Sequence, residues 1–395
     1  MTTPHAHDIV ICSAARTPIG RFLGAFSGTP ATRLGSVAIA AAVERAGLDP
    51  ARVDEVLMGC VLSADLGQAP ARQAALGAGL PASTPATTVN KVCGSGLKAV
   101  MLAADSLALG HGHVAVAGGM ECMSNAPYLV PTGRAGHKAG HVSMLDHMMR
   151  DGLEDAYDSG RAMGSFGEDL ARRYGYTRAQ QDAYAAETVR RAQRAVDDGT
   201  FDAEVVPVQP AAAVAAIARD EIPGRIDPAK IPRLKPAFAA DGSVTAASSS
   251  ANGDAAAAVV LSTREKAQRL GLPVLATIRG HASFARVPSE FTLAPIGAIR
   301  KVLQRLDWRP QDVDLYEINE AFAVVVMAAM RDLEITHERV NVHGGACALG
   351  HPIGASGARV LVTLLHAMKR HGARRGVASL CIGGGEAVAM AVEAG

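Results

Sequence analysis

Short apolar segments alternate with helical patterns toward both ends of the chain. Residues 8–13, 55–59 and 114–118 are short and largely apolar, which predicts buried strands. Residues 34–46 and 96–109 instead carry apolar side chains at the spacing of a helix. Short strands interleaved with helices are typical of layered α/β proteins. The hydrophobic pattern therefore predicts an α/β fold.

Two pairs of segments repeat at a separation of about 260 residues. Residues 48–56 (LDPARVDEV) resemble residues 308–316 (WRPQDVDLY), and both follow a helical pattern and enter a strand. Residues 112–121 (GHVAVAGGME) resemble residues 376–386 (GVASLCIGGGE). The repeats indicate that the two ends of the chain form related halves.

The segment between these halves has a different character. Residues 178–198 form a long polar helical pattern, and residues 222–236 are interrupted by prolines. Such a segment suggests an inserted cap, which in many proteins binds substrate, although a plain linker is the alternative. We predict a first half from residues 1–122 plus about 252–273, an inserted loop or cap domain at 123–251, and a second half at 274–395.

Composition limits the classes of function. The 395 residues are 49% hydrophobic but only 4% aromatic, which favours tightly packed layers, and the formal net charge of +1 gives no basic field for nucleic acid. Six irregularly spaced cysteines without a CxxC pair predict neither a disulfide framework nor a zinc site. No secretion signal is visible, and the longest apolar run, residues 321–330, is too short to cross a bilayer. We expect a cytoplasmic protein that binds no membrane.

Cys93 is the first candidate for chemistry. It lies in residues 89–97 (VNKVCGSGL), where a turn with two glycines opens a predicted helix. The positive end of a helix dipole and its unpaired backbone N–H groups favour a thiolate, so the thiol is a usable nucleophile. Cysteine is also a common small buried residue, which is the alternative interpretation.

His351 is the second candidate. Five glycines surround it in residues 341–357, and a helix is predicted at residues 358–371. An imidazole fixed there could deprotonate Cys93. A phosphate-binding loop or a structural histidine are alternatives, but the spacing matches neither a P-loop nor a dinucleotide fingerprint.

Two further segments carry polar groups at the ends of predicted strands. Cys381 ends one strand and is followed by three glycines, whose backbone amides could line an oxyanion hole while the cysteine transfers a proton. Asn319 lies between a strand and the apolar helix that follows. It could orient a water or donate to an oxyanion, and a helix N-cap is the alternative.

At these four segments the chain closely resembles the thiolase family. The resemblance extends to residues 16–20, 118–125, 235–238 and 245–250, and it covers essentially the whole chain with its motifs in order. It implies a thiolase-like duplicated five-layered α-β-α-β-α core with an inserted loop or cap domain.

The resemblance also implies a role for each candidate. Cys93 would carry the acyl group, His351 would activate it, and Cys381 would move the proton of the second substrate. The backbone amides of Cys93 and Gly383 would stabilise the first oxyanion. His351 and a water positioned by Asn319 would stabilise the enolate.

The implied activity is that of an acetyl-CoA C-acetyltransferase, an acyltransferase of fatty acid metabolism. Two acetyl-CoA would give acetoacetyl-CoA and CoA through a ping-pong mechanism with an acyl-Cys93 intermediate. A 3-ketoacyl-CoA thiolase of broader chain length is the second choice, and a non-catalytic acyl-CoA-binding protein is the third. A ketosynthase is disfavoured because such enzymes usually lack the second cysteine, here Cys381. No resident cofactor is expected, since the CoA esters are substrates.

The resemblance also implies which residues contact the substrate. Ser250 would contact the pantetheine, and Met163, Phe238 and Phe322 would line the acyl pocket, although ordinary apolar packing would explain the last three. Ala162, Ala255 and His343 depart from the family pattern, and the histidine that is missing at Ala162 leaves the chain-length preference open. A homodimer or homotetramer is implied, with residues 134–147 as a candidate tetramer contact.

A metal site was the remaining alternative. His137, His141 and His147 lie close in sequence, but the glycines around them argue against the helix that an i,i+4 pair of ligands would need. No carboxylate or cysteine completes the set in sequence, so no metal is expected.

Overall fold

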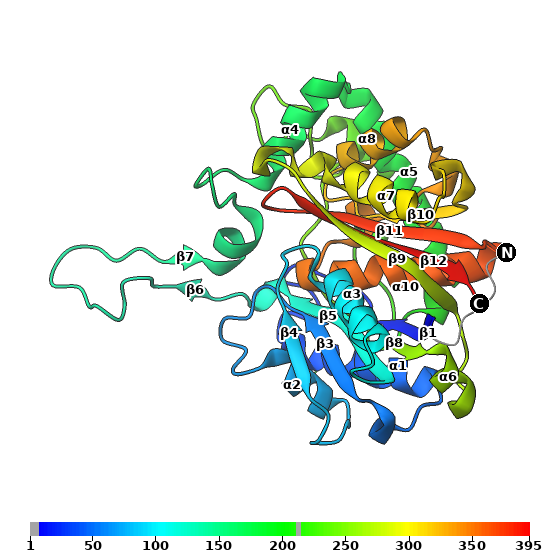
Figure 1. Cartoon of the computed structure of the whole chain (residues 1–395). Helices are drawn as coiled ribbons and strands as arrows, with labels where there is room; N and C mark the ends of the chain where they lie inside the picture. The colour runs from blue at the N-terminus through cyan, green and yellow to red at the C-terminus, as the bar shows by residue number, and fades with distance from the viewer. Residues whose placement is uncertain (1–7, 211–214) are drawn as a thin grey trace.

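A computed structural model describes residues 8–210 and 215–395 (Figure 1). In these residues the main sheet has ten strands, in the order β10-β11-β12-β9-β1-β8-β5-β3-β4, with β2 beside β8. The main strands are β1 (Ile9–Arg16), β2 (Gly20–Arg21), β3 (Glu55–Gly59), β4 (Ala86–Val89), β5 (Val114–Cys122), β8 (Gly253–Thr263), β9 (Ala276–Ala285), β10 (Leu315–Ile318), β11 (Arg375–Ile382) and β12 (Glu386–Ala394).

The sheet consists of two halves that meet at a short junction. β3, β4 and β5 run parallel in the first half, and β10 and β11 run parallel in the second. The junction is the pairing of β1 with β9, where Val10 faces Thr277 and Ile11 faces Ala276. β8 returns to the first half and pairs with β1 and β5. The proposed domain boundaries themselves stay a prediction.

Three apolar cores separate the layers. One lies between the first half and α1 and α2, one lies around α3 and α10 between the two halves, and one lies between the second half and α7 and α8. The order of helix, sheet, helix, sheet, helix is the five-layered arrangement expected from the sequence. The helices are α1 (Ala31–Arg45), α2 (Pro70–Gly77), α3 (Ser95–Ala108), α4 (Met163–Tyr174), α5 (Arg178–Asp197), α6 (Arg264–Leu270), α7 (Ala294–Arg305), α8 (Ala323–Leu333), α9 (Ala346–Leu349) and α10 (Ile353–His371).

The start of α10 differs from the sequence prediction. The helix begins at Ile353 rather than at residue 358, with Pro352 at its N-cap. The prediction placed Gly354 and Gly357 before the helix, but both are helical. A Cβ on Gly354 would come within 3.0 Å of Cys60 Cα, and one on Gly357 would overlap the backbone of Leu97. These glycines therefore allow α10 to pack closely against its neighbours.

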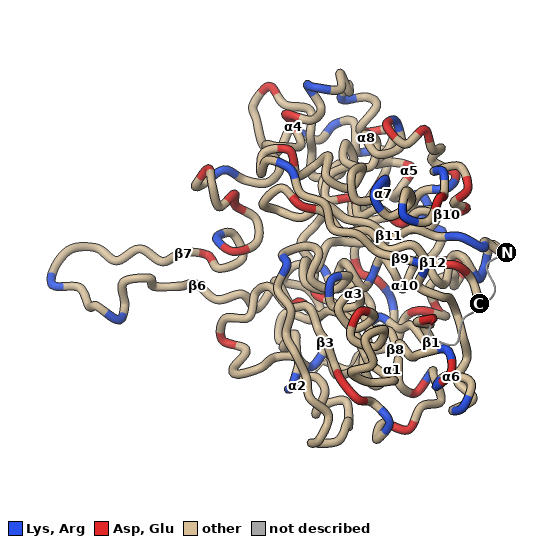
Figure 2. The backbone as a smooth tube through the Cα atoms, viewed as in Figure 1, with Lys and Arg blue, Asp and Glu red and all other residues tan. Residues whose placement is uncertain are grey.

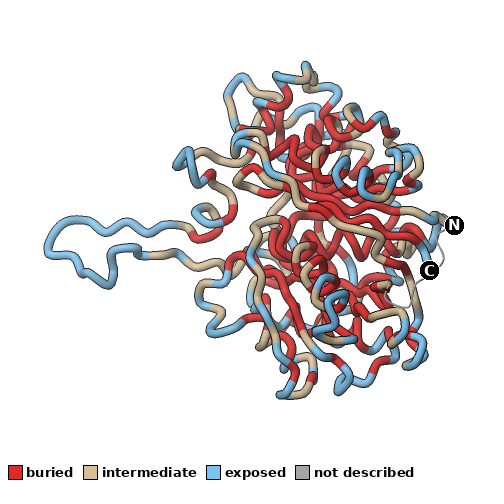
Figure 3. The backbone as a smooth tube through the Cα atoms, viewed as in Figure 1, coloured by how far each residue is buried: buried red, intermediate tan, exposed pale blue. Residues whose placement is uncertain are grey.

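The inserted segment packs mainly on the second half and also forms an arm. α4 contacts α8, and α5 contacts α8 and α9. The arm is the hairpin of β6 (Tyr128–Leu129) and β7 (Leu145–Asp146) with the loop between them, which extends to the left in Figure 1 and is exposed in Figure 3.

Charged residues of both signs are spread over the outer helices and loops, and few of them lie on the central strands (Figure 2). Over residues 8–210 and 215–395, we find no helix that combines the length and the apolar character needed to cross a membrane.

Candidate active site

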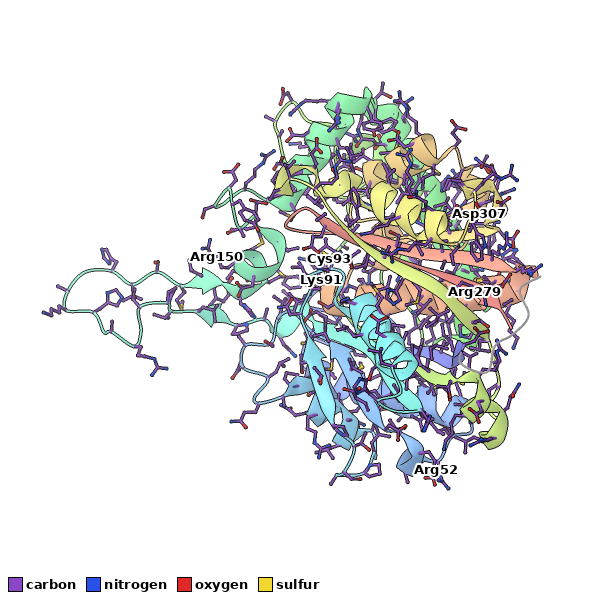
Figure 4. The ribbon with its side chains drawn as sticks, viewed as in Figure 1. Arg52, Lys91, Cys93, Arg150, Arg279 and Asp307 are labelled. Carbon is purple, nitrogen blue, oxygen red and sulfur yellow. The ribbon has the colours of Figure 1, made fainter. Side chains whose placement is uncertain are left out.

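Cys93 lies on a tight turn between β4 and α3 (Figure 4). The N–H of Gly94 donates to the carbonyl of Lys91 at 3.0 Å, and the N–H of Ser95 donates to the carbonyl of Val92 at 3.0 Å. Val92 has φ +45°, which is rare for a β-branched residue. Such strain persists only where the surroundings enforce it, and it is concentrated at functional sites. The turn places Cys93 two residues before Ser95, the first residue of α3.

The surroundings of Cys93 favour the thiol. Burial raises the pKa of Cys93 to about 11, although backbone N–H groups of Gly383 and of Cys93 itself act in the opposite direction. The sequence suggested that the helix dipole would favour the thiolate, but desolvation outweighs it here. At neutral pH, Cys93 therefore needs a base to accept its proton.

Cys381 and the glycine turn after it face the nucleophile. Burial and the neighbouring Cys93 both raise the pKa of Cys381. Ile382 packs so closely on Gly94 that a Cβ there would overlap its side chain. The Gly383 amide also lies close enough to Cys93 to oppose the rise of its pKa, so the ends of β4 and β11 meet at one place.

His351 is held as a neutral imidazole in one tautomer. Its Nδ1 lies 2.6 Å from Oγ of Ser356, and that hydroxyl donates to the carbonyl of Pro352 at 2.8 Å. Because a hydroxyl has one proton, Ser356 must accept from Nδ1–H, which leaves the lone pair on Nε2. Burial, reinforced by the positive charge of Arg359, lowers the pKa of His351 to about 3. Nε2 is buried and has no hydrogen-bond partner among the residues that the structure describes, so it can accept a proton in the site.

Glu121 ties the loop of His351 to the first half. Its carboxylate accepts from the N–H groups of Val61 at 3.0 Å, Leu62 at 3.1 Å and Gly354 at 2.9 Å. Val61, Leu62 and Ile353 belong to one apolar cluster, and Cys93 packs against that cluster. Neither Glu121 nor Ser356 was assigned a role from sequence. The glutamate at the end of the repeated strand was the signal that could have identified Glu121.

Asn319 follows β10 and is fully buried. Its N–H donates to the carbonyl of Ser379 at 2.9 Å, which places it beside β11, the strand of Cys381. Within residues 8–210 and 215–395, neither atom of its side-chain amide has a hydrogen-bond partner. The N-cap of α8 is Phe322, so the alternative interpretation of Asn319 as a helix cap is wrong. A buried amide without partners is costly unless it binds a ligand or water.

The residues assigned to the substrate also gather here. Ser250 donates from its N–H and from Oγ to the carbonyl of Ala321, at 3.0 and 3.1 Å. The rings of Phe238 and Phe322 meet edge to face with centroids 5.9 Å apart. A Cβ on Gly383 would come 3.4 Å from Sδ of Met163, so the thioether borders the glycine turn.

The three histidines considered for a metal occupy different surroundings. His137 pairs with Thr132 at 2.6 Å on the exposed arm, whereas His147 is buried and pairs with Asp151 at 2.7 Å. In the part of the chain that the structure describes, no group of three or more His, Cys, Asp or Glu is arranged to hold a metal ion.

A surface cavity of about 480 Å³ lies elsewhere, between α4, β9 and α7. Its lining includes Arg173, Phe284 and Arg300 but none of the candidate catalytic residues. The candidate active site is therefore identified by its catalytic side chains and not by the volume of a cavity.

Comparison with known families decides the classification. The family model for the N-terminal domain of thiolase matches residues 9–265, and the model for its C-terminal domain matches residues 272–394. The chain belongs to the thiolase family. The thiolase resemblance predicted from sequence is thereby confirmed.

Curated thiolases cover almost the whole chain. Acetyl-CoA acetyltransferase 2 of Arabidopsis thaliana is 51% identical over 391 residues, spanning 98% of this chain and 97% of the relative. Acetyl-CoA acetyltransferase of Cupriavidus necator is 50% identical over 392 residues, spanning 98% and 99%. The crystal structure of Acat5 thiolase from Ascaris suum in complex with coenzyme A is 41% identical, with a TM-score of 0.93 over 98% of this chain and 100% of that one. This match confirms the thiolase fold.

Proposed function

We propose that the protein is an acetyl-CoA C-acetyltransferase that joins two acetyl-CoA into acetoacetyl-CoA and CoA, and catalyses the reverse reaction. The observation that carries the proposal is the meeting of Cys93 with Cys381 and the Gly383 amide. Cys93 also packs against the apolar cluster that contains Ile353, two residues after the neutral His351. Relatives about half identical to this chain bear the name of that enzyme.

In the first half-reaction, the sulfur of Cys93 attacks the thioester carbonyl of acetyl-CoA while Nε2 of His351 accepts the thiol proton. The amides of Cys93 and Gly383 donate to the oxyanion of the tetrahedral intermediate. Collapse of that intermediate breaks the bond to the CoA sulfur, which takes the proton from His351. Acetyl-Cys93 and CoA are the products.

In the second half-reaction, Nε2 of His351 accepts the thiol proton of Cys381, and the resulting thiolate removes an α-proton from another acetyl-CoA. His351 and a water positioned by Asn319 stabilise the enolate oxygen. The carbanion attacks the acetyl carbonyl, and the sulfur of Cys93 leaves and takes the proton from Nε2 of His351. Cys381 keeps the α-proton as its thiol. The high pKa of Cys381 suits this step, because a strong base is needed to remove such a proton.

Chain length is the main question about specificity. Acetoacetyl-CoA is the proposed substrate for cleavage, and a broader range of 3-ketoacyl-CoA is the alternative because Ala162 departs from the family pattern. The test is thiolysis with CoA and 3-ketoacyl-CoA of increasing length. We expect kcat/KM to be highest for acetoacetyl-CoA. A maximum at longer chains would favour the alternative, and no cleavage of any member would contradict the proposal.

The proposal extends to assembly and surroundings. The arm exposes Tyr128, Val130, Val142 and Met144, and an apolar patch on a protruding hairpin suits contact with another copy in a tetramer. Removal of residues 131–144 is expected to reduce the mass measured by light scattering to that of a dimer. An unchanged mass would exclude the arm as the contact.

A cytoplasmic enzyme without a resident cofactor completes the proposal. All six cysteines are free of disulfides, as a reducing compartment requires. One relative, from Rattus norvegicus, is named as mitochondrial, so cell fractionation is the test of location.

A further inference from the structure

An ion pair joins the turn of the nucleophile to the glycine turn. Nζ of Lys91 contacts Oε2 of Glu386, although the two residues are separated by 295 positions. Lys91 lies two residues before Cys93, with Val92 between them. Glu386 is the first residue of β12 and directly follows the three glycines. Figure 4 shows Lys91 beside Cys93. The pair therefore connects the two turns that carry the nucleophile and the oxyanion donor.

The position of each turn depends on contacts with residues outside that turn. The nucleophile turn follows β4, which is the edge strand of the sheet. The glycine turn closes the hairpin of β11 and β12, with Gly384 at φ +91° and Gly385 at φ +95°. On its outer side, the carbonyl of Gly385 accepts from the N–H of Arg286 at 2.7 Å. Three consecutive glycines have little intrinsic rigidity, so their position relative to Cys93 must come from such contacts.

The other contacts between the two turns do not by themselves fix the position of the glycine turn relative to Cys93. Ile382 packs on Gly94, which is an apolar contact, and the Gly383 amide approaches Cys93 itself. Apolar contact is not directional, whereas an ion pair joins two defined atoms. The Lys91 side chain is 24% exposed and that of Glu386 is 37% exposed. At such exposure an ion pair adds about 0–1 kcal/mol to overall stability, so its effect should be local.

We propose that the Lys91–Glu386 ion pair positions the Gly383 oxyanion donor relative to the sulfur of Cys93. Both are positioning residues, because neither needs to touch the reacting atoms. The proposal rests on the function proposed above and adds two residues to which that function assigned no role. A misplacement of about 1 Å at a catalytic site can reduce the rate about 100-fold, so even a small shift of the glycine turn is measurable.

The test compares Lys91→Met, Glu386→Met and the charge-swapped double variant Lys91→Glu/Glu386→Lys. Each single variant is expected to lower kcat for thiolysis of acetoacetyl-CoA about tenfold, with KM and melting temperature nearly unchanged. The double variant is expected to recover most of kcat. A purely structural role would lower the melting temperature, and loss of a substrate contact would raise KM.

The matched control is Arg269→Met, which breaks the exposed pair with Glu265 on α6. In the shared view of Figures 1 and 4, α6 lies well away from Cys93. It is expected to keep wild-type kcat. Wild-type kcat in both single variants, or a double variant slower than either, would overturn the positioning role while leaving the proposed function intact. A wild-type protein without thiolysis activity would overturn both.

Discussion

Nδ1 of His351 lies 2.6 Å from Oγ of Ser356, and this contact decides which ring nitrogen can accept a proton. The hydroxyl proton is already used in the bond to Pro352, so the imidazole must donate from Nδ1. The base is therefore Nε2, and its direction is fixed by a side chain that does not touch the substrate.

Replacement of Ser356 by Ala should slow acylation of Cys93 without unfolding the protein. Without the hydroxyl, the imidazole can rotate or take the other tautomer, and supporting groups of this kind are typically worth about 10- to 100-fold in activity. The measurement is the rate of the first release of CoA from acetyl-CoA in rapid mixing. Acylation at the wild-type rate would show that Ser356 does not orient the base.

Replacement of Asn319 by Ala should affect the other half-reaction. Removal of one oxyanion donor costs about 10²- to 10³-fold, so condensation should slow by that factor while acylation of Cys93 is retained. Because the buried amide has no protein partner, the melting temperature should not fall. Condensation at the wild-type rate would remove Asn319 from the mechanism.

Alanine at Gly383 and at Gly384 should have different effects. At Gly383 the added Cβ would come 3.4 Å from Met163, an ordinary contact, and the N–H donor remains. Gly384 has φ +91°, so Ala there is strained by about 1–3 kcal/mol, and relief of the strain would move the turn. We expect Gly383→Ala to keep kcat within about tenfold and Gly384→Ala to lose more. The opposite order would contradict the assignment of a backbone donor at Gly383.

The pH dependence of stability should reflect His343. Burial lowers the pKa of this imidazole from the ordinary 6.5 to about 4. As the pH falls below 6.5 the unfolded state binds the proton first, so the free energy of unfolding decreases until the pH reaches about 4. His343→Asn removes this contribution, and its melting temperature should fall less over that range than that of the wild type.

Comparing His343→Asn with the wild type cancels the contributions of other titratable groups to the pH dependence of stability. Burial raises the pKa of Glu121 to about 7 and that of Glu317 to about 8, which opposes the histidine effect in both proteins equally. An equal fall in melting temperature for His343→Asn and the wild type between pH 7 and pH 4 would contradict the buried, neutral state of His343.

Much of the fold followed from local patterns. The strand at Glu55–Gly59 and the helix at Arg178–Asp197 were predicted almost to the residue, because each has a clear period and a clear end. The start of α10 was misplaced because a sequence does not distinguish a glycine that turns the chain from one that allows close packing. Gly354 and Gly357 belong to the second kind.

The motifs of the site could be predicted from the sequence, but the residues that support them could not. Cys93, His351, Cys381 and Asn319 stood out because each lies at the end of a predicted element. Ser356 and Glu121 did not, since their importance depends on which distant backbone groups the fold brings to them. The pKa of Cys93 was expected to fall at a helix terminus, and only the three-dimensional packing shows that burial raises it.

The central claim is that Cys93 carries the acyl group and Cys381 completes condensation. The most direct measurement is the intact mass of the wild type, Cys93→Ala and Cys381→Ala after incubation with acetyl-CoA. Cys93→Ala should fold, bind CoA esters and never gain the mass of an acetyl group. Cys381→Ala should gain one acetyl group and form no acetoacetyl-CoA. An acetylated Cys93→Ala protein, or condensation by the Cys381→Ala protein, would contradict the account.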